Sequence, residues 1–260
     1  MAASLKSTSE GGATLVLTIS NPEQHNALGP DIYAAGVEAI IAAETNPDVR
    51  SVVITGEGST FSAGGNLHRL KAAREGQLEL QRQSLESLNS WIEAIRSSPK
   101  PVIAAVEGAA AGAGFSLVLA CDFVVAADDA FFVMAHSKIG LSPDGGGSWQ
   151  LARALPRPLV SDAVMRGARL SAATLHRHGL INELTPAGQA LGAALALAGD
   201  LNARPSNALS DIKELIGEAQ MQPLSAHLER ERELFMRNLL HANAGEGIAA
   251  FLEKRSPRFR

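Results

Sequence analysis

Three glycine-rich segments and one aspartate are the parts of this sequence best suited to chemistry. The segments are residues 61–67 (FSAGGNL), 108–114 (GAAAGAG) and 143–148 (PDGGGS), and Asp144 lies inside the third. A glycine- or alanine-rich loop that enters a helix leaves main-chain N–H groups without partners inside that helix. Two such N–H groups from different loops can hold one oxygen atom and stabilise negative charge on it. These segments therefore predict an oxyanion-binding site, and the alternative is that small residues only permit close helix–sheet packing.

Asp144 is the first candidate for proton transfer. A carboxylate above a pocket can take up and return a proton, whereas the alternative for an aspartate here is a turn or helix cap. Burial would raise the pKa of this carboxyl group and a helix N-terminus would lower it, so the direction stays open. His136, in residues 134–137 (MAHS), is the second candidate, and its alternative is a hydrogen-bonded structural histidine.

The sequence lacks the patterns typical of nucleotide-binding and metal-binding sites. Residues 108–114 lack the Lys-Ser/Thr pair that ends a P-loop and do not follow the G-x-G-x-x-G pattern. His176 and His178 lie two positions apart in a predicted helix, where their side chains point apart. Cys121 is the one cysteine, which excludes a cysteine-cluster metal site, and its apolar surroundings predict a buried small hydrophobic residue. We expect no metal and no separate cofactor.

Composition limits the class of protein. A chain of 260 residues with 46% hydrophobic and 19% charged residues has the makeup of a folded domain, not of a disordered chain. The net charge of −4 argues against a nucleic-acid partner. No signal-peptide pattern opens the chain, and its uncharged stretches are too short to span a bilayer. These features predict a cytoplasmic protein with no membrane partner.

The elements that must position these residues alternate between strand and helix. Runs of β-branched and apolar residues that end at turn residues predict strands at 14–19, 51–55, 101–106 and 123–126. Helices are expected between them, at 30–44, within 66–98 and up to about residue 121. This order predicts an α/β fold with a parallel sheet or a spiral of strands, and ligands of such folds bind at the carboxyl ends of the strands.

Only helices are expected in the second half of the chain. The α/β part is predicted to extend to about residue 147, within a core of residues 1–200. Residues 201–260 are predicted to form a helical oligomerisation region. The expected helices are at 148–156, 158–167, 171–179, 187–202, 205–219, 223–241 and 245–254.

Together, the order and spacing of the three segments resemble the crotonase superfamily, that is, the enoyl-CoA hydratase/isomerase family. The resemblance runs from residues 21–28 (NPEQHNAL) to 251–255 (FLEKR) and is strongest at 61–67, 102–122 and 139–155. It implies a crotonase-like spiral of ββα turns and a C-terminal helical trimerisation region. It also implies homotrimers or dimers of trimers.

The resemblance further implies an acyl-CoA thioester as substrate, so that coenzyme A is part of the substrate and not a cofactor. The two N–H groups that hold the thioester oxygen in the family match Gly65 and Ala113. Contacts to the substrate from a neighbouring subunit match Phe251 and Lys254. The other expected substrate-binding positions are Gln24, His25, Ala27, Ala63, Gly64, Asn66, Leu67, Ala109, Gly112 and Leu141.

The sequence departs from the hydratases of this family at their two catalytic glutamates. Ser116 and His136 stand at those positions, and a serine of ordinary pKa does not act as a general base without a base of its own. Asp144 matches the position where some relatives, enoyl-CoA isomerases among them, carry their working carboxylate. The resemblance thus favours isomerisation or ring chemistry in which Asp144 shuttles a proton and His136 and Ser116 line or orient the site.

Two other functions remain open. The first is an enoyl-CoA hydratase, or a hydrolase similar to alternative-type oxepin-CoA hydrolases, in which His136 and Asp144 share the acid and base roles. The second is a protein that binds CoA thioesters without catalysis.

Overall fold

A six-stranded sheet forms the centre of the computed structural model, which describes residues 3–259. Its strand order is β1-β2-β3-β4-β6-β9, and every neighbouring pair is parallel except β1 and β2. A second sheet of three short strands has the order β5-β7-β8. The strands are β1 (Ser4–Glu10), β2 (Thr14–Ser20), β3 (Ser51–Gly56), β4 (Val102–Val106), β5 (Ala109–Ala111), β6 (Phe123–Ala127), β7 (Phe131–Val133), β8 (Arg169–Ser171) and β9 (Glu183–Thr185).

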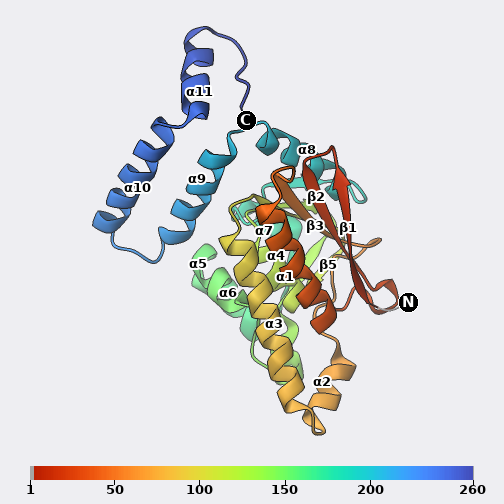
Figure 1. The fold of residues 1–260 in the computed structure, drawn as a ribbon. Helices are drawn as coiled ribbons and strands as arrows, with labels where there is room; N and C mark the ends of the chain where they lie inside the picture. The colour runs from red at the N-terminus through yellow and green to blue at the C-terminus, as the bar shows by residue number, and fades with distance from the viewer. Residues whose placement is uncertain (1–2, 260) are drawn as a thin grey trace.

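Helices cover both faces of the large sheet (Figure 1). The α-helices are α1 (Pro30–Thr45), α2 (Leu67–Arg74), α3 (Leu78–Ser97), α4 (Ala113–Ala120), α5 (Gly147–Ala154), α6 (Arg157–Met165), α7 (Ala172–Arg177), α8 (Ala190–Asn202), α9 (Ser206–Glu218), α10 (Leu224–Leu239) and α11 (Ala242–Leu252). Two short 3-10 helices are η1 (Pro22–Gln24) and η2 (Ala135–Ile139).

Side chains alternate between the two faces along the central strands, so each face has its own core. On one face Ala190, Ala194 and Ala198 of α8 pack on a group of branched residues that includes Val53 and Ile103. Their spacing of four places the three alanines on one side of α8, and their small side chains let the helix approach the sheet closely. The opposite face is covered by α1, α3 and α4 and forms the larger core.

Helices α1 and α3 pack against each other, and both contribute residues to the surface beside the glycine-rich segments. Trp91 of α3 is fully buried and packs where Gly36 of α1 has no side chain, because a Cβ at Gly36 would overlap the indole ring. Tyr33, one turn earlier on α1, has its ring 6.4 Å from that of Trp91, centroid to centroid. The positions of both helices relative to each other are thus set by one glycine and two aromatic rings.

The last helices leave the body of the protein. Lys213 anchors α9 to the core, since its ammonium group lies 2.7 Å from the Asp122 carboxylate and donates to the Ile95 carbonyl at 2.8 Å. Beyond α9, α10 and α11 project away from the sheet (Figure 1). Across residues 3–259, no helix combines the length and the apolar character that crossing a membrane requires.

The four strands predicted from the sequence are present, each within one residue of its expected ends, and the predicted helices overlap observed ones. The expectation that only helices follow residue 147 is wrong, because β8 and β9 lie beyond it and β9 completes the large sheet beside β6. Both strands have three residues, which is too short for a period of two to be recognised. The N-terminal β1 was not expected either, since it is exposed along most of its length and has little apolar pattern.

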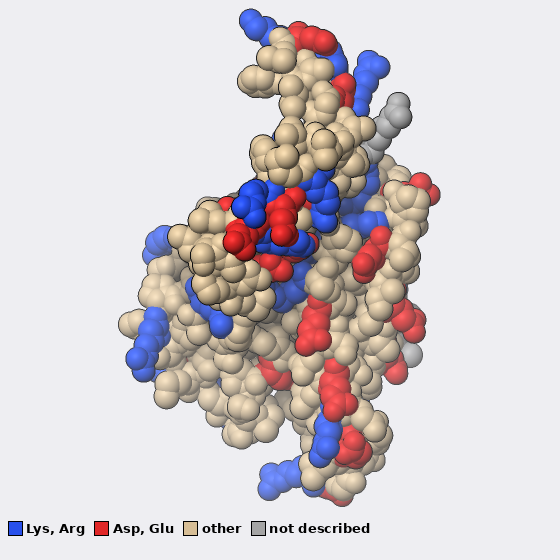
Figure 2. Space-filling model, turned by 60° about the vertical axis from the view of Figure 1, so that its left-hand side comes forward, with Lys and Arg blue, Asp and Glu red and all other residues tan. Residues whose placement is uncertain are grey.

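Acidic and basic side chains are interspersed on the face shown in Figure 2, so charge does not mark an interaction surface there. Four apolar residues of α10, however, lie on one face of that helix. Leu224, Leu228, Phe235 and Leu239 fall within about 60° of one another at 100° per residue. Their exposed fractions are 72%, 52%, 67% and 43%, whereas Leu234 faces inward and is 2% exposed. Exposed apolar areas of this kind are typical of interaction surfaces.

We predict that this apolar face of α10 packs against another copy of the chain, so that Phe235→Asp shifts the protein toward the monomer. A buried carboxylate without a partner would destabilise such an interface. Light scattering after gel filtration measures the mass, which we expect at a multiple of 27.2 kDa for the unchanged chain. The control is Leu78→Asp, at a 71% exposed leucine of α3. A monomeric unchanged chain, or an equal effect of both substitutions, would contradict the prediction.

Candidate active site

A cavity of about 400 Å³ is enclosed by the three glycine-rich segments together with α1, α2 and α3. We call it the loop cavity. All three glycine-rich segments contribute residues to its wall, including Gly65, Gly112 and Asp144. The sequence-predicted positions Ala63, Asn66, Leu67, His136 and Leu141 also lie in its wall.

The first glycine-rich segment is held in place by main-chain pairing. The Ser62 N–H donates to the Ala109 carbonyl, and the Ala111 N–H donates to the Ser62 carbonyl, both at 2.9 Å. On the other side the Leu28 N–H donates to the Gly64 carbonyl at 2.8 Å. Gly64 has a φ of +85°, and a Cβ there would lie 2.5 Å from the Ala111 carbonyl oxygen. Only glycine therefore fits this close approach of the first segment to the second.

Two main-chain N–H groups remain available where these segments meet. Ala113 is the first residue of α4, so its N–H has no acceptor inside the helix. Neither this N–H nor that of Gly65 donates to any described residue. A Cβ built at Gly64 would be only 3.4 Å from the Ala113 nitrogen, which shows how closely the two segments approach. An oxyanion-binding pair requires two unpaired N–H groups close together. Gly65 lines the loop cavity and Ala113 does not, and the assignment of both to that role stays a prediction.

Ser116 lies one turn into α4 and supports the third segment. Its hydroxyl group donates to the main-chain carbonyl of Asp144 at 2.9 Å, and the residue is fully buried. A Cβ at Gly147 would lie 2.7 Å from the Ser116 oxygen, so the glycines of the third segment make room for this contact. Ser116 therefore holds the main chain of Asp144 and does not line the loop cavity.

Asp144 and His136 face each other in the wall of the loop cavity. The Nε2 atom of His136 lies 3.3 Å from Oδ1 of Asp144, and the two side chains are 10% and 29% exposed. Oδ1 of Asp144 and Nδ1 of His136 have no hydrogen-bond partner among the described residues. Asp144 does not cap α5, whose N-cap is Gly146. The Asp144 carboxylate thus lines the loop cavity and faces one imidazole across 3.3 Å.

A second hollow of about 350 Å³ adjoins the loop cavity, and we call it the outer hollow. Gln24 and Ala27 lie in its wall, and Asn66 is shared with the loop cavity. The Asn66 amide donates to the Gln24 side-chain oxygen at 2.6 Å. The two hollows thus join two groups of predicted substrate-binding residues into one continuous surface.

Seven predicted residues line neither hollow: Gly64, Ala113 and Ser116, described above, and His25, Ala109, Phe251 and Lys254. Ala109 pairs with Phe131 in the small sheet and His25 occupies an exposed turn with a φ of 50°, so neither lines the two hollows. Phe251 is 84% exposed at the end of α11, and Lys254 follows it in the projecting part of the chain. Their contact with a neighbouring subunit's substrate stays a prediction.

Sequence reasoning missed several residues of the loop cavity, among them the polar residues Tyr33, Arg69 and Ser84. Burial, and secondarily the nearby Asp144 charge, raises the pKa of the Tyr33 hydroxyl, whereas Arg69 acts in the opposite direction. The Arg69 guanidinium makes no hydrogen bond or ion pair with a described residue and lies where the loop cavity meets the outer hollow. The one available signal was that Tyr33 is the single tyrosine of the chain.

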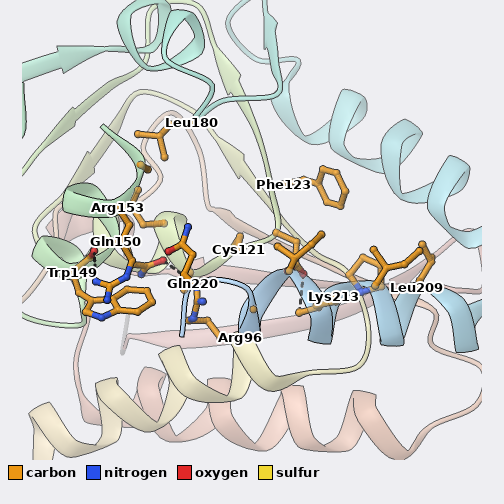
Figure 3. Close-up of a pocket in the computed structure, with 18 of the residues that line it drawn as sticks. Arg96, Cys121, Phe123, Trp149, Gln150, Arg153, Leu180, Leu209, Lys213 and Gln220 are labelled. Carbon is orange, nitrogen blue, oxygen red and sulfur yellow. Dashed lines mark hydrogen bonds and ion pairs between the residues drawn. The ribbon is translucent and has the colours of Figure 1, made fainter. Parts of the chain in front are cut away.

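Another cavity, of about 390 Å³, lies between α9 and the core (Figure 3). Its charged groups already have partners, since Lys213 pairs with Asp122 and the Arg153 guanidinium lies 3.7 Å from the centroid of the Trp149 ring. Cys121 is partly exposed there, not fully buried as expected, and desolvation raises the pKa of its thiol. Within residues 3–259 no cluster of three His, Cys, Asp or Glu side chains is placed to hold a metal ion. The loop cavity is therefore the candidate active site.

Comparisons with known proteins agree with this location. A family model described as enoyl-CoA hydratase/isomerase matches residues 9–260. A protein named 1,2-epoxyphenylacetyl-CoA isomerase from Escherichia coli is 36% identical, with 94% of both chains covered. A protein named 2,3-dehydroadipyl-CoA hydratase from the same organism is 33% identical over 95% of this chain and 94% of its own. The crystal structure of an enoyl-CoA hydratase from Polaromonas superposes with a TM-score of 0.97, at 64% identity, over 99% of this chain and 100% of that chain.

We predict that Ser116→Ala lowers the free energy of unfolding by about 0.5–1.5 kcal/mol, because it removes the hydrogen bond from a fully buried residue to the Asp144 carbonyl, which keeps the Gly147 N–H as its other donor. The matched control is Ser90→Ala on α3, whose exposed hydroxyl donates to the Glu86 carbonyl at 2.9 Å. That substitution is expected to change stability by no more than about 0.5 kcal/mol. Urea unfolding of both variants measures the difference, and equal losses would show that the Ser116 contact adds nothing.

Proposed function

This chain belongs to the enoyl-CoA hydratase/isomerase family, and from that premise we propose that it shifts a proton along the acyl group of an acyl-CoA thioester. One observation carries the proposal. Asp144 is the only carboxylate among the described residues that line the loop cavity. A single carboxylate suits a reaction that takes up one proton and returns it to the same molecule.

The proposed reaction has two steps. The Asp144 carboxylate removes a proton from the carbon next to the thioester, and the electron pair of the broken C–H bond moves onto the thioester oxygen. The N–H groups of Gly65 and Ala113 stabilise the resulting enolate, as donors positioned in advance of the reaction. When the acyl group carries a double bond between its β- and γ-carbons, this bond is conjugated with the enolate. Asp144 then returns the proton at the γ-carbon, the double bond moves to the α,β position, and the thioester carbonyl forms again. The steps balance without a cofactor.

Hydration is the second candidate, and it requires a second acid or base besides Asp144. Ser116 is engaged with the Asp144 carbonyl and lies outside the loop cavity, so it does not serve. His136, at 3.3 Å from Asp144, is the group that favours this alternative. A hydratase or an oxepin-CoA hydrolase-type activity would use this pair. The relatives named isomerase and hydratase support one alternative each. A catalytic role is supported over a non-catalytic one, because the two relatives are named as an isomerase and a hydratase.

Arg69 suggests where the coenzyme A part of the substrate lies. Its guanidinium has no hydrogen-bond or ion-pair partner in the described part of the chain and stands between the loop cavity and the outer hollow. A guanidinium in such a position can bind a phosphate with two parallel hydrogen bonds. We propose that the thioester enters the loop cavity while the phosphates of coenzyme A pass Arg69 in the outer hollow.

We predict that Asp144→Asn lowers kcat by about 10²- to 10⁴-fold, since an amide cannot take up the proton. The exchange of the α-hydrogens of phenylacetyl-CoA in D₂O, followed by NMR, measures this step without knowledge of the natural acyl group. Titration calorimetry measures binding of the same ester, which we expect to change far less. The control is Asp162→Asn, at an exposed aspartate that pairs with Arg166 on the surface of α6.

Full exchange by the Asp144 variant would contradict the shuttle role. The same measurements on His136→Gln separate the two candidate reactions. Under the proposed function the variant retains α-hydrogen exchange, whereas addition of water to crotonyl-CoA, with loss of this activity in the variant, would favour hydration.

Arg69→Gln is expected to raise KM for an acyl-CoA ester by roughly tenfold to a hundredfold, the range for a lost hydrogen bond to a charged group, with a small effect on kcat. Lys71→Gln is the control, because Lys71 is exposed on the same helix and lines neither hollow. Steady-state kinetics over a range of ester concentrations provides both constants. A lower kcat at unchanged KM would place Arg69 in the chemical step instead.

A further inference from the structure

The wall of the loop cavity contains two hydroxyl groups that the proposed proton transfer does not use. They belong to Tyr33 of α1 and Ser84 of α3, which line the cavity and are only 4% and 5% exposed. The third buried residue of the wall is apolar, since Leu28 is 2% exposed. The buried part of the wall therefore offers two hydrogen-bond donors beside apolar surface.

Helix α3, which carries Ser84, packs beside both Tyr33 and the segment that contains Asp144. Ser84, Leu88 and Trp91 lie on one side of α3, since they are four and three residues apart. The Leu88 side chain would lie 3.2 Å from a Cβ at Gly145, the residue after Asp144. Trp91 contacts the Tyr33 ring. Trp91 lies seven residues from Ser84, about 10 Å along the helix, so Tyr33 and Ser84 are two separate donor positions in the wall of the loop cavity. Leu88 relates Ser84 to the Asp144 segment, and the Asp144 charge acts on Tyr33.

Neither hydroxyl group has a partner within the described residues. No hydrogen bond involves the Tyr33 or the Ser84 hydroxyl, although both residues are more than nine-tenths buried. Burial and the Asp144 charge raise the pKa of Tyr33, so it is a neutral phenol that donates at physiological pH. A hydrocarbon that covered both hydroxyl groups would leave two buried donors unsatisfied, and each such loss weakens binding by roughly tenfold to a hundredfold.

We infer that Tyr33 and Ser84 are the two donor positions of a subsite for oxygen carried by the acyl group, such as a hydroxyl, an epoxide or ether oxygen, or a ring carbonyl. The substrate class is then an oxygenated acyl-CoA ester and not an unsubstituted alkyl or aryl one. This inference rests on the proposed function, because it places the acyl group in the loop cavity. A site that donates to a substrate oxygen rejects the analogue without that oxygen far more strongly than an apolar pocket rejects one methylene.

The test compares α-hydrogen exchange of phenylacetyl-CoA with that of its ortho-, meta- and para-hydroxy derivatives in D₂O. For the unchanged chain we expect kcat/KM of the best hydroxylated ester to exceed that of phenylacetyl-CoA by about tenfold or more. Tyr33→Phe should reduce this ratio by about tenfold. Two effects contribute to this change. The variant lacks the hydrogen-bond donor for the hydroxylated ester, so kcat/KM for that ester falls. It also has no buried donor left unpaired when phenylacetyl-CoA is bound, so kcat/KM for phenylacetyl-CoA rises. A merely structural role would lower both rates together.

Ser84→Ala provides a second, smaller substitution should Tyr33→Phe fail to fold, and it should reduce the ratio in the same direction. Ser87→Ala is the matched control on α3, because its hydroxyl already donates to the Gln83 carbonyl at 2.9 Å. Exchange of all four esters with a ratio near one, or a ratio that neither variant changes, would overturn the subsite alone. Absence of exchange with every ester would instead contradict the proposed function.

Discussion

The close approach of residues 62–65 to the start of α4 is the constraint on which the rest of the site depends. It exists because Ser62 pairs with the strand before α4 and because Gly64, with its positive φ, leaves the Ala111 carbonyl unobstructed. A side chain at Gly64 would separate the two segments by displacing one main chain from the other. The N–H groups of Gly65 and Ala113 would then no longer meet, and under the proposed function the enolate would lose its stabilising pair. Everything else in the loop cavity is arranged around this contact.

Helix α4 links this contact to the carboxylate. Its first residue, Ala113, carries one of the two N–H groups, and three residues later Ser116 binds the main chain of Asp144. Residues three apart lie on the same side of a helix, about one turn from each other. Under the proposed function, this one turn therefore relates the N–H group that would stabilise negative charge to the segment whose carboxylate would move the proton. The burial of α4 against the sheet is what makes this separation reproducible, since positions within 0.5 Å or so matter for a catalytic group.

The sequence predicted the parts of the site that rest on local patterns. Strands such as Ser51–Gly56 have continuous apolar runs, and the glycine-rich segments and Asp144 stand out by composition. It did not predict Glu183–Thr185, whose place in the sheet is decided by its distant partner strand and not by its three residues. Tyr33 and Ser84 were missed for a related reason. On an amphipathic helix a cavity-lining residue has the same spacing as a core residue, and only the packing of α1 on α3 separates the two.

The presence of a serine where hydratases of the family have a glutamate gains a physical meaning from its hydrogen bond. Ser116 faces away from the loop cavity and holds the Asp144 segment, so the change from glutamate removes one carboxylate and at the same time supports another. A site with two opposed carboxylates can activate water with one and protonate carbon with the other. A site with Asp144 alone has its proton donor and acceptor at the same atom, and the simplest product of that geometry is the substrate with one hydrogen moved.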